Sequence, residues 1–164
     1  PDSTPPVISV PDTVYEDATS PAGAVVTYSV GAVDDIDPNP TITCNPASGS
    51  VFAQLLTTVT CTAIDAAGNS ALKSFDVVVK DANWQLLDLE SLVSNLNLGK
   101  LGASLRDKLE AARRFVASDK PNQARDTLSS FINQVNAQIG KAFTADQATE
   151  LIARATRIQN VLGS

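Results

Sequence analysis

The sequence contains no histidine and no methionine, and only two of its 164 residues are cysteine. These residue types supply most general bases, soft-metal ligands and thiol nucleophiles in proteins. Two cysteines without histidine also fall short of a structural zinc site. The scarcity of these residues argues against an enzyme, and the sequence offers no candidate catalytic residue.

Long apolar runs and aromatic residues are also scarce. No run of about 18 apolar residues predicts a membrane span, and no signal-peptide pattern is present. Aromatic residues make up 5% of the chain, too few to line a sugar-binding cleft, so we do not interpret the aspartates as a glycosidase pair. The start at Pro1 indicates a processed mature chain or an excerpt of a longer one.

The net charge is −6, and it is unevenly distributed. Residues 1–82 hold ten acidic and two basic residues, whereas residues 83–164 hold eight acidic and ten basic ones. A nucleic-acid partner is therefore not expected, because binding to phosphates requires a basic surface. The two parts carry opposite net charge and should attract each other weakly.

The first part, residues 1–82, has the pattern of short antiparallel strands. Turn residues rich in proline, glycine and asparagine separate the expected strands, which cover residues 7–10, 24–30, 41–44, 57–64 and 70–80. In the fourth, Val59, Cys61 and Ala63 alternate with threonines, as in a half-buried strand. This spacing of strands predicts an immunoglobulin-like antiparallel β-sandwich.

Cys44 and Cys61 fall near the ends of two expected strands. Their thiols can form a disulfide if these strands are neighbours, and otherwise they are two buried free thiols. In an oxidising compartment the bridge would stabilise the fold by roughly 3 kcal/mol.

Four segments carry a resemblance to a known module: DSTPPVISVPD, SPAGAVVTYSV, AVDDIDPNPTITCNPASGS and TTVTCTAIDAAGNSALKSFDVVV. Together they closely resemble the HYR (hyalin repeat) domain, an immunoglobulin-like module of extracellular proteins, over about residues 3–80. The resemblance implies an adhesive or spacer role and a disulfide between Cys44 and Cys61. In place of the family's usual Phe-Pro-x-Gly segment the chain has FAQLL, so the resemblance does not itself supply a turn there. Leu55 and Leu56 of this segment are expected to be exposed and are candidate interface residues.

One group of polar residues has the chemistry of a calcium site. Carboxylate and amide oxygens suit calcium, and the candidates lie in an acidic loop and in the DAAGN turn: Asp34, Asp35, Asp37, Asp65 and Asn69. The spacing is not that of an EF-hand loop. Asp and Asn also stabilise turns through their own backbone, so we name calcium as a candidate and commit to no metal or other cofactor.

The second part, residues 83–164, changes to helical periodicity at Trp84. Apolar residues recur at helical spacing over residues 84–97, 102–118, 121–139 and 144–162, with Asn83 as the expected first cap and Gly99 and Gly102 as breaks. The short connections predict an antiparallel four-helix bundle, giving an α+β protein with two separate domains. Trp84, at the junction, is a candidate packing or interface residue.

The helical part resembles the FIMAH domain, a helical module at the C-terminus of bacterial exported proteins. The segments SLRDKLEAA, LSSFINQVNAQIGKAFTADQATELI and IQNVLGS carry this resemblance over about residues 84–163. The resemblance places the module in an exported bacterial protein but implies no activity for it.

The sequence therefore predicts a non-catalytic structural or adhesion module outside a bacterial cell. Its expected partners are a surface protein or polysaccharide, or other copies of itself. The first alternative is a subunit of an extracellular filament built through head-to-tail contacts between the two domains. The second is the accessory tail of a secreted enzyme.

Overall fold

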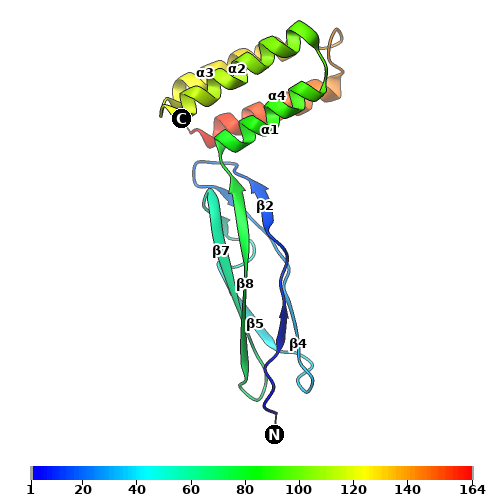
Figure 1. The fold of residues 1–164 in the computed structure, drawn as a ribbon, viewed down its shortest axis with the longest axis vertical. Helices are drawn as coiled ribbons and strands as arrows, with labels where there is room; N and C mark the ends of the chain where they lie inside the picture. Colours follow the sequence, from blue (N-terminus) through cyan, green and yellow to red (C-terminus); the bar gives the residue numbers. More distant parts are fainter. Residues whose placement is uncertain (1, 164) are drawn as a thin grey trace. The chain divides into compact units, whose positions relative to one another are not determined.

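The computed structural model describes residues 2–163, so Pro1 lies outside the described part. The protein is α+β, with a β-sheet region followed by four helices (Figure 1). By their internal contacts the residues form two units. The β unit comprises residues 2–16 and 23–79, and the helical unit comprises residues 17–22 and 80–163.

The strands of residues 2–163 form three sheets. They are β1 (Val7–Ser9), β2 (Val14–Asp17), β3 (Ala24–Val25), β4 (Gly31–Val33), β5 (Thr41–Asn45), β6 (Val51–Phe52), β7 (Leu55–Ile64) and β8 (Ser70–Lys80). The largest sheet has the order β2-β8-β7-β5, and the others pair β1 with β4 and β3 with β6. The β1–β4, β3–β6, β5–β7 and β7–β8 pairs are all antiparallel.

The expected alternation on β7 is confirmed. Val59, Cys61 and Ala63 are fully buried, while Thr58 and Thr60 on the opposite face are exposed. The exposed threonines bind across to β8: the hydroxyl of Thr58 donates to Asp76 at 2.8 Å, and Thr60 and Ser74 share a 3.1 Å hydrogen bond. One face of the sheet is therefore apolar and the other is a ladder of hydroxyl groups.

The strand expected over residues 24–30 is mostly wrong, because only Ala24–Val25 is strand. Beyond Val26 a side chain replaces the backbone partner: the N–H of Tyr28 donates to the hydroxyl of Ser48, which in turn donates to the carbonyl of Tyr28. A serine that satisfies both backbone groups takes the place of a neighbouring strand. Gly23, which precedes β3, has φ of 114°, and a Cβ there would meet the Phe52 carbonyl oxygen at 1.9 Å.

The helical unit is a four-helix bundle of α1 (Ala82–Asn95), α2 (Gly99–Ala117), α3 (Pro121–Asn136) and α4 (Ala145–Val161). The expected capping box of α4 is present, since Thr144 and Gln147 satisfy each other's backbone N–H groups. The cap expected at Asn83 is wrong: Asp81 caps α1 by accepting from the N–H of Trp84. The expected breaks are also misplaced, because α2 begins at Gly99 and contains Gly102.

The helical unit also includes residues 17–22, although the sequence pattern predicted residues 1–82 to form the β part. The buried Gln85 donates through Nε2 to the carbonyls of Ala18 and Lys80, at 3.0 and 2.9 Å. Arg157 on α4 donates to Oε1 of Gln85 at 2.9 Å and forms a 2.6 Å ion pair with Asp17. A segment about 60 residues earlier in the chain is thus part of the folded helical unit.

Candidate functional site

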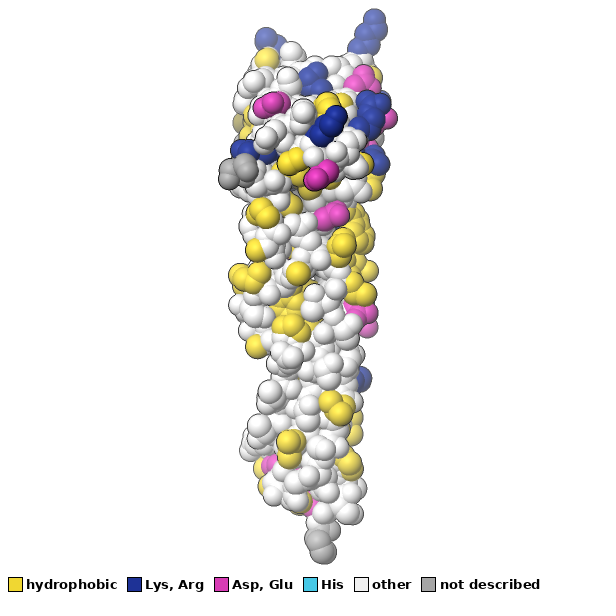
Figure 2. Space-filling view, turned by 90° about the vertical axis from the view of Figure 1, so that its left-hand side faces the viewer, with side chains coloured by type: hydrophobic (Ala, Val, Ile, Leu, Met, Phe, Trp, Pro, Cys, Tyr) yellow, Lys and Arg dark blue, Asp and Glu magenta, His cyan; other side chains and the backbone are white. Residues whose placement is uncertain are grey.

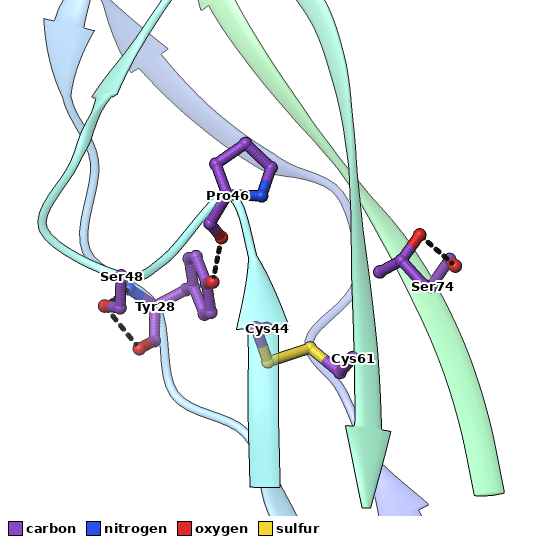
Figure 3. The surroundings of a disulfide bond; sticks show 7 residues. Tyr28, Cys44, Pro46, Ser48, Cys61 and Ser74 are labelled. Atoms are coloured by element: carbon purple, nitrogen blue, oxygen red, sulfur yellow. Dashed lines mark hydrogen bonds between the residues drawn. A yellow bond between two sulfur atoms is a disulfide. The ribbon is translucent and has the colours of Figure 1, made fainter.

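The predicted disulfide is present and joins two neighbouring strands (Figure 3). Cys44 on β5 and Cys61 on β7 are directly opposite each other in the register, with their Cα atoms 4.0 Å apart. Cys61 is fully buried, whereas Cys44 is partly exposed. The bridge closes the outer strand of the largest sheet onto its neighbour.

Tyr28 lies beside the disulfide with its hydroxyl group held (Figure 3). The hydroxyl donates to the carbonyl of Pro46, and the ring packs edge-on against Phe75 with the ring centroids 4.9 Å apart. Burial raises the pKa of Tyr28 and outweighs the opposing effect of its hydrogen bond with Ser48. The phenol is therefore a protonated donor at neutral pH and is unsuited to act as a base.

A cavity of about 400 Å³ opens next to this ring. Its lining residues are Tyr28, Ser29, Val30, Ile42, Cys44, Ala47 and Ser48. Apart from the protonated phenol of Tyr28, these residues carry no group that titrates, because Cys44 is in the disulfide. The cavity can hold a small apolar group, but its lining offers no acid–base pair for catalysis.

The acidic loop between β4 and β5 is organised by its own carboxylates. Oδ1 of Asp34 accepts from the N–H groups of Ile36 and Asp37, at 3.1 and 2.9 Å. Asp37 accepts from Asn39 within the loop and from Ala66 in the DAAGN turn, both at 2.9 Å. These bonds are the backbone-capping role in turns that Asp and Asn were expected to have as the alternative to calcium binding.

Asp65 is a second carboxylate devoted to a turn. Its oxygens accept from the backbone N–H and the side-chain amide of Asn69, both at 2.8 Å. Burial raises the pKa of Asp65, but these bonds, together with those from the backbone of Gly68 and Ala67, favour the charged form and leave the pKa below its usual value. The carboxylate is thereby kept ionised in the folded chain.

The structure divides the five calcium candidates. Asp34 and Asp35 come together with Asp2, with one carboxylate oxygen from each within 4.8 Å of the others. Asp65 and Asn69 pair with each other instead. Asp2 was not predicted as part of this group. The hydroxyl of Thr4 donates to the carboxylates of both Asp2 and Asp35 and so links Asp2 to the acidic loop. Spacing along the sequence does not reveal this contact.

An apolar groove of about 550 Å³ lies beside these carboxylates. Its lining residues are Thr4, Pro5, Val7, Val33, Asp34 and Asp35. Val7 and Val33 are directly opposite each other on β1 and β4, and they are 68% and 69% exposed. The groove therefore combines an apolar floor with an acidic rim, and no single sequence motif predicted it.

The predicted interface residues Leu55 and Leu56 are 54% and 63% exposed at the start of β7. The chain does turn here, and Leu55 adopts φ of 74° at the position where the Phe-Pro-x-Gly segment has glycine. Trp84, in the helical unit, is 39% exposed with Lys80 Nζ 5.9 Å from the centre of its ring. All three side chains present apolar surface to solvent.

A charged groove of about 400 Å³ lies on α1 and α2 of the helical unit. Arg113 crosses it, with Nη1 3.1 Å from Glu90 and Nε 3.4 Å from Asn83. The remaining lining residues are Arg106, Asp107, Glu110, Arg114 and Ala117. The two signs of charge neutralise each other along this groove, so it does not select a ligand of one charge.

Two known domain families match the chain, one over the strands and one over the helices. Residues 1–79 match the HYR domain, and residues 89–160 match the FIMAH domain. No significant match was found among curated proteins or solved structures. In the described residues, no helix has both the length and the hydropathy that crossing a membrane requires.

Proposed function

Because the chain consists of an HYR domain followed by a FIMAH domain, we propose that it is a non-catalytic structural or adhesion module of a bacterial surface or secreted protein. The observation that carries this proposal is the order of the two modules, together with the bridged cysteine pair of the first. Both families are non-catalytic, and a disulfide persists in oxidising compartments such as the cell exterior.

The architecture that goes with this function is an immunoglobulin-like sandwich followed by a separate helical bundle. The apolar faces of β7 and β8 and the small β1–β4 and β3–β6 pairs supply two layers for such a sandwich. A sandwich of this kind serves as a rigid spacer or a binding platform without a catalytic cleft.

The test is binding of the purified chain to intact bacterial envelopes, to isolated surface polysaccharide and to surface proteins. We expect saturable binding to one of these materials, and we expect the bound material not to be hydrolysed. If the chain binds none of them above the level of an unrelated HYR domain of similar charge, the adhesion proposal is wrong.

The accessory-tail alternative makes a different prediction. If the chain is the tail of a secreted enzyme, peptide mapping of the native polypeptide should place a catalytic domain on the same chain. Loss of these residues should then lower activity on an insoluble substrate while activity on a soluble one remains.

The second candidate function is a subunit of an extracellular filament. It is supported by the opposite charge of the two parts of the chain and by the apolar surface at Leu55, Leu56, Val7 and Val33. A head-to-tail contact that does not close on itself produces a filament. Electron microscopy of the concentrated protein tests this candidate, and single particles of uniform size at every concentration would exclude it.

A further inference from the structure

The apolar groove at Val7 and Val33 has the properties of a docking site for a basic side chain. The two valines are opposite each other on the paired strands β1 and β4 and leave a continuous apolar floor with Pro5. The floor ends at Asp34 and Asp35, which also line the groove. A lysine side chain matches this arrangement, because its aliphatic stem covers apolar surface while its ammonium group reaches a carboxylate.

The acidic rim carries more charge than its two aspartates alone. The β unit has eight acidic side chains and a single basic one, Lys73, among its described residues. A third acid joins the two that line the groove, because Asp2, Asp34 and Asp35 each place a carboxylate oxygen within 4.8 Å of the others. Lys73 donates to the carbonyl of Ile8 at 3.1 Å and forms no ion pair with the acids of this rim among the described residues.

The helical unit supplies complementary cations. Eleven of its described side chains are basic, and Figure 2 shows Lys and Arg side chains gathered on the visible face of this unit. Three of its lysines are exposed: Lys100, Lys120 and Lys141. Within residues 2–163 the ion pairs of this unit use Lys80 and arginines. Lys141 donates to the carbonyl of Ala137 at 3.4 Å, and none of the three exposed lysines is paired with a carboxylate of the described chain.

We propose that the groove binds the helical unit of a second copy of this chain, with an exposed lysine of that unit seated on Val7 and Val33 and paired with Asp35. This inference rests on the filament candidate above and names the surface that would form its contact. The groove and the lysines belong to different surfaces of one chain, so the contact is heterologous and repeats from copy to copy.

The first test removes the apolar floor and keeps its shape. Val7→Thr with Val33→Thr preserves β-branching at two exposed positions, so the fold should be retained. The matched control is Val25→Thr with Val51→Thr, a second pair of valines opposite each other on β3 and β6, which are 60% and 59% exposed. Sedimentation of the full chain over a concentration series should show association weakened about tenfold by the first pair and unchanged by the control.

The second test removes the rim charge. Asp35→Asn keeps an oxygen that can accept from Thr4, whose hydroxyl lies 2.6 Å from Asp35. Asp12→Asn, at an exposed position outside the groove, makes the same change in net charge. Only Asp35→Asn should weaken association, and raising the salt concentration should weaken association of the unmodified chain because salt screens charges beyond the Debye length.

The third test identifies the partner residue. Carbodiimide joins a carboxylate to a nearby amine without a spacer, and a mixture of isotopically light and heavy chains distinguishes links between copies from links within one. We expect a mixed-isotope link between Asp35 and Lys100, Lys120 or Lys141. The Lys→Glu variant of the linked residue should abolish assembly, and Asp35→Lys should restore it.

The outcomes separate this inference from the proposals on which it stands. A chain that stays monomeric at every concentration overturns both the groove contact and the filament candidate, while surface binding still tests the adhesion proposal. Filaments that form equally well with threonine at positions 7 and 33 overturn the groove contact alone. Links found only within one chain also overturn it.

Discussion

At the scale of single residues, Leu55 is the clearest mismatch between a side chain and its backbone. Its φ of 74° belongs to the left-handed region, which costs a residue with a Cβ roughly 1–2 kcal/mol. Leu55→Gly removes that cost, while the greater freedom of glycine in the unfolded chain offsets about 0.4–1 kcal/mol of the gain. We therefore expect urea unfolding to show a more stable variant, by roughly 0.5 kcal/mol.

Leu56 is the matched control for this substitution. It is similarly exposed and follows directly in β7, but its φ is not in the left-handed region. Glycine inside a strand is unfavourable, so Leu56→Gly should destabilise the chain by about 1 kcal/mol. Equal effects of the two substitutions would show that side-chain exposure, and not backbone conformation, determines the stability at this turn.

Asp65 gives the stability of the chain a specific dependence on pH. Its pKa is lower in the folded chain than in the unfolded one, so its stabilising effect is fully present above the unfolded pKa of about 3.9. The effect is lost as the pH falls through the lower folded pKa. The difference in unfolding free energy between the unmodified chain and Asp65→Asn should thus shrink as the pH falls below about 4.

Denaturant unfolding at neutral pH and at several acidic values measures this difference. Asp12→Asn is a suitable control, because the Asp12 side chain is exposed and accepts no hydrogen bond from the described residues. If the difference in unfolding free energy between the unmodified chain and Asp65→Asn stays constant with pH, the hydrogen bonds of Asp65 do not lower its pKa in the folded chain.

At the scale of elements, the disulfide fixes β5 to β7. It joins residues 17 positions apart, and a loop of that length is stabilised by about 3 kcal/mol through the unfolded chain. Cys44→Ala with Cys61→Ala should lower the unfolding free energy by about that amount, since alanine keeps the buried position of Cys61 apolar. Reduction of the unmodified chain should have the same effect, and reductant should leave the double variant unchanged.

The segment 17–22 depends on one buried glutamine in the helical unit. Gln85 is 2% exposed and satisfies the carbonyl of Ala18, so Gln85→Leu leaves that carbonyl without its partner. Arg157 also loses one acceptor and keeps its ion pair with Asp17. The expected loss is about 2 kcal/mol of unfolding free energy. Hydrogen exchange at residues 17–22 should accelerate as well, which a general loss of packing in the bundle alone would not produce.

Gln123→Leu is the control for this prediction. Gln123 is also on a helix of the bundle, but it is exposed, and substitutions at such positions change stability by less than about 0.5 kcal/mol. A loss at Gln123 as large as that at Gln85 would attribute the effect to leucine itself and not to the orphaned carbonyl.

At the scale of the whole molecule, we expect the melting temperature to be the same in millimolar calcium and in excess chelator. The carboxylates of Asp37 and Asp65 are occupied by backbone N–H groups, and Asn69 is paired with Asp65. Differential scanning calorimetry checks this expectation. A rise with calcium that disappears in Asp35→Asn would instead assign an ion to Asp2, Asp34 and Asp35.

The periodic parts of the chain could be predicted because the spacing of apolar residues indicates which face of a strand or helix is buried. The alternation at Val59, Cys61 and Ala63 predicted the inner face of β7, and the Thr144 and Gln147 pair predicted the start of α4. The strand expected over residues 24–30 failed beyond Val25, because the hydroxyl of Ser48 competes with a strand for the backbone of Tyr28. Side-chain competition of that kind leaves no mark on hydrophobic periodicity.

The sequence by itself determined the two kinds of secondary structure, the residues of the disulfide and the resemblance to two extracellular modules. These depend on local periodicity and on motifs that are contiguous in the chain. Only the tertiary structure placed Asp17–Ala22 in the helical unit, brought Asp2 to the acidic loop and set Val7 opposite Val33. Such groups are assembled from residues about 25 to 140 positions apart, and their contacts depend on how the chain folds back on itself, which spacing along the sequence does not encode.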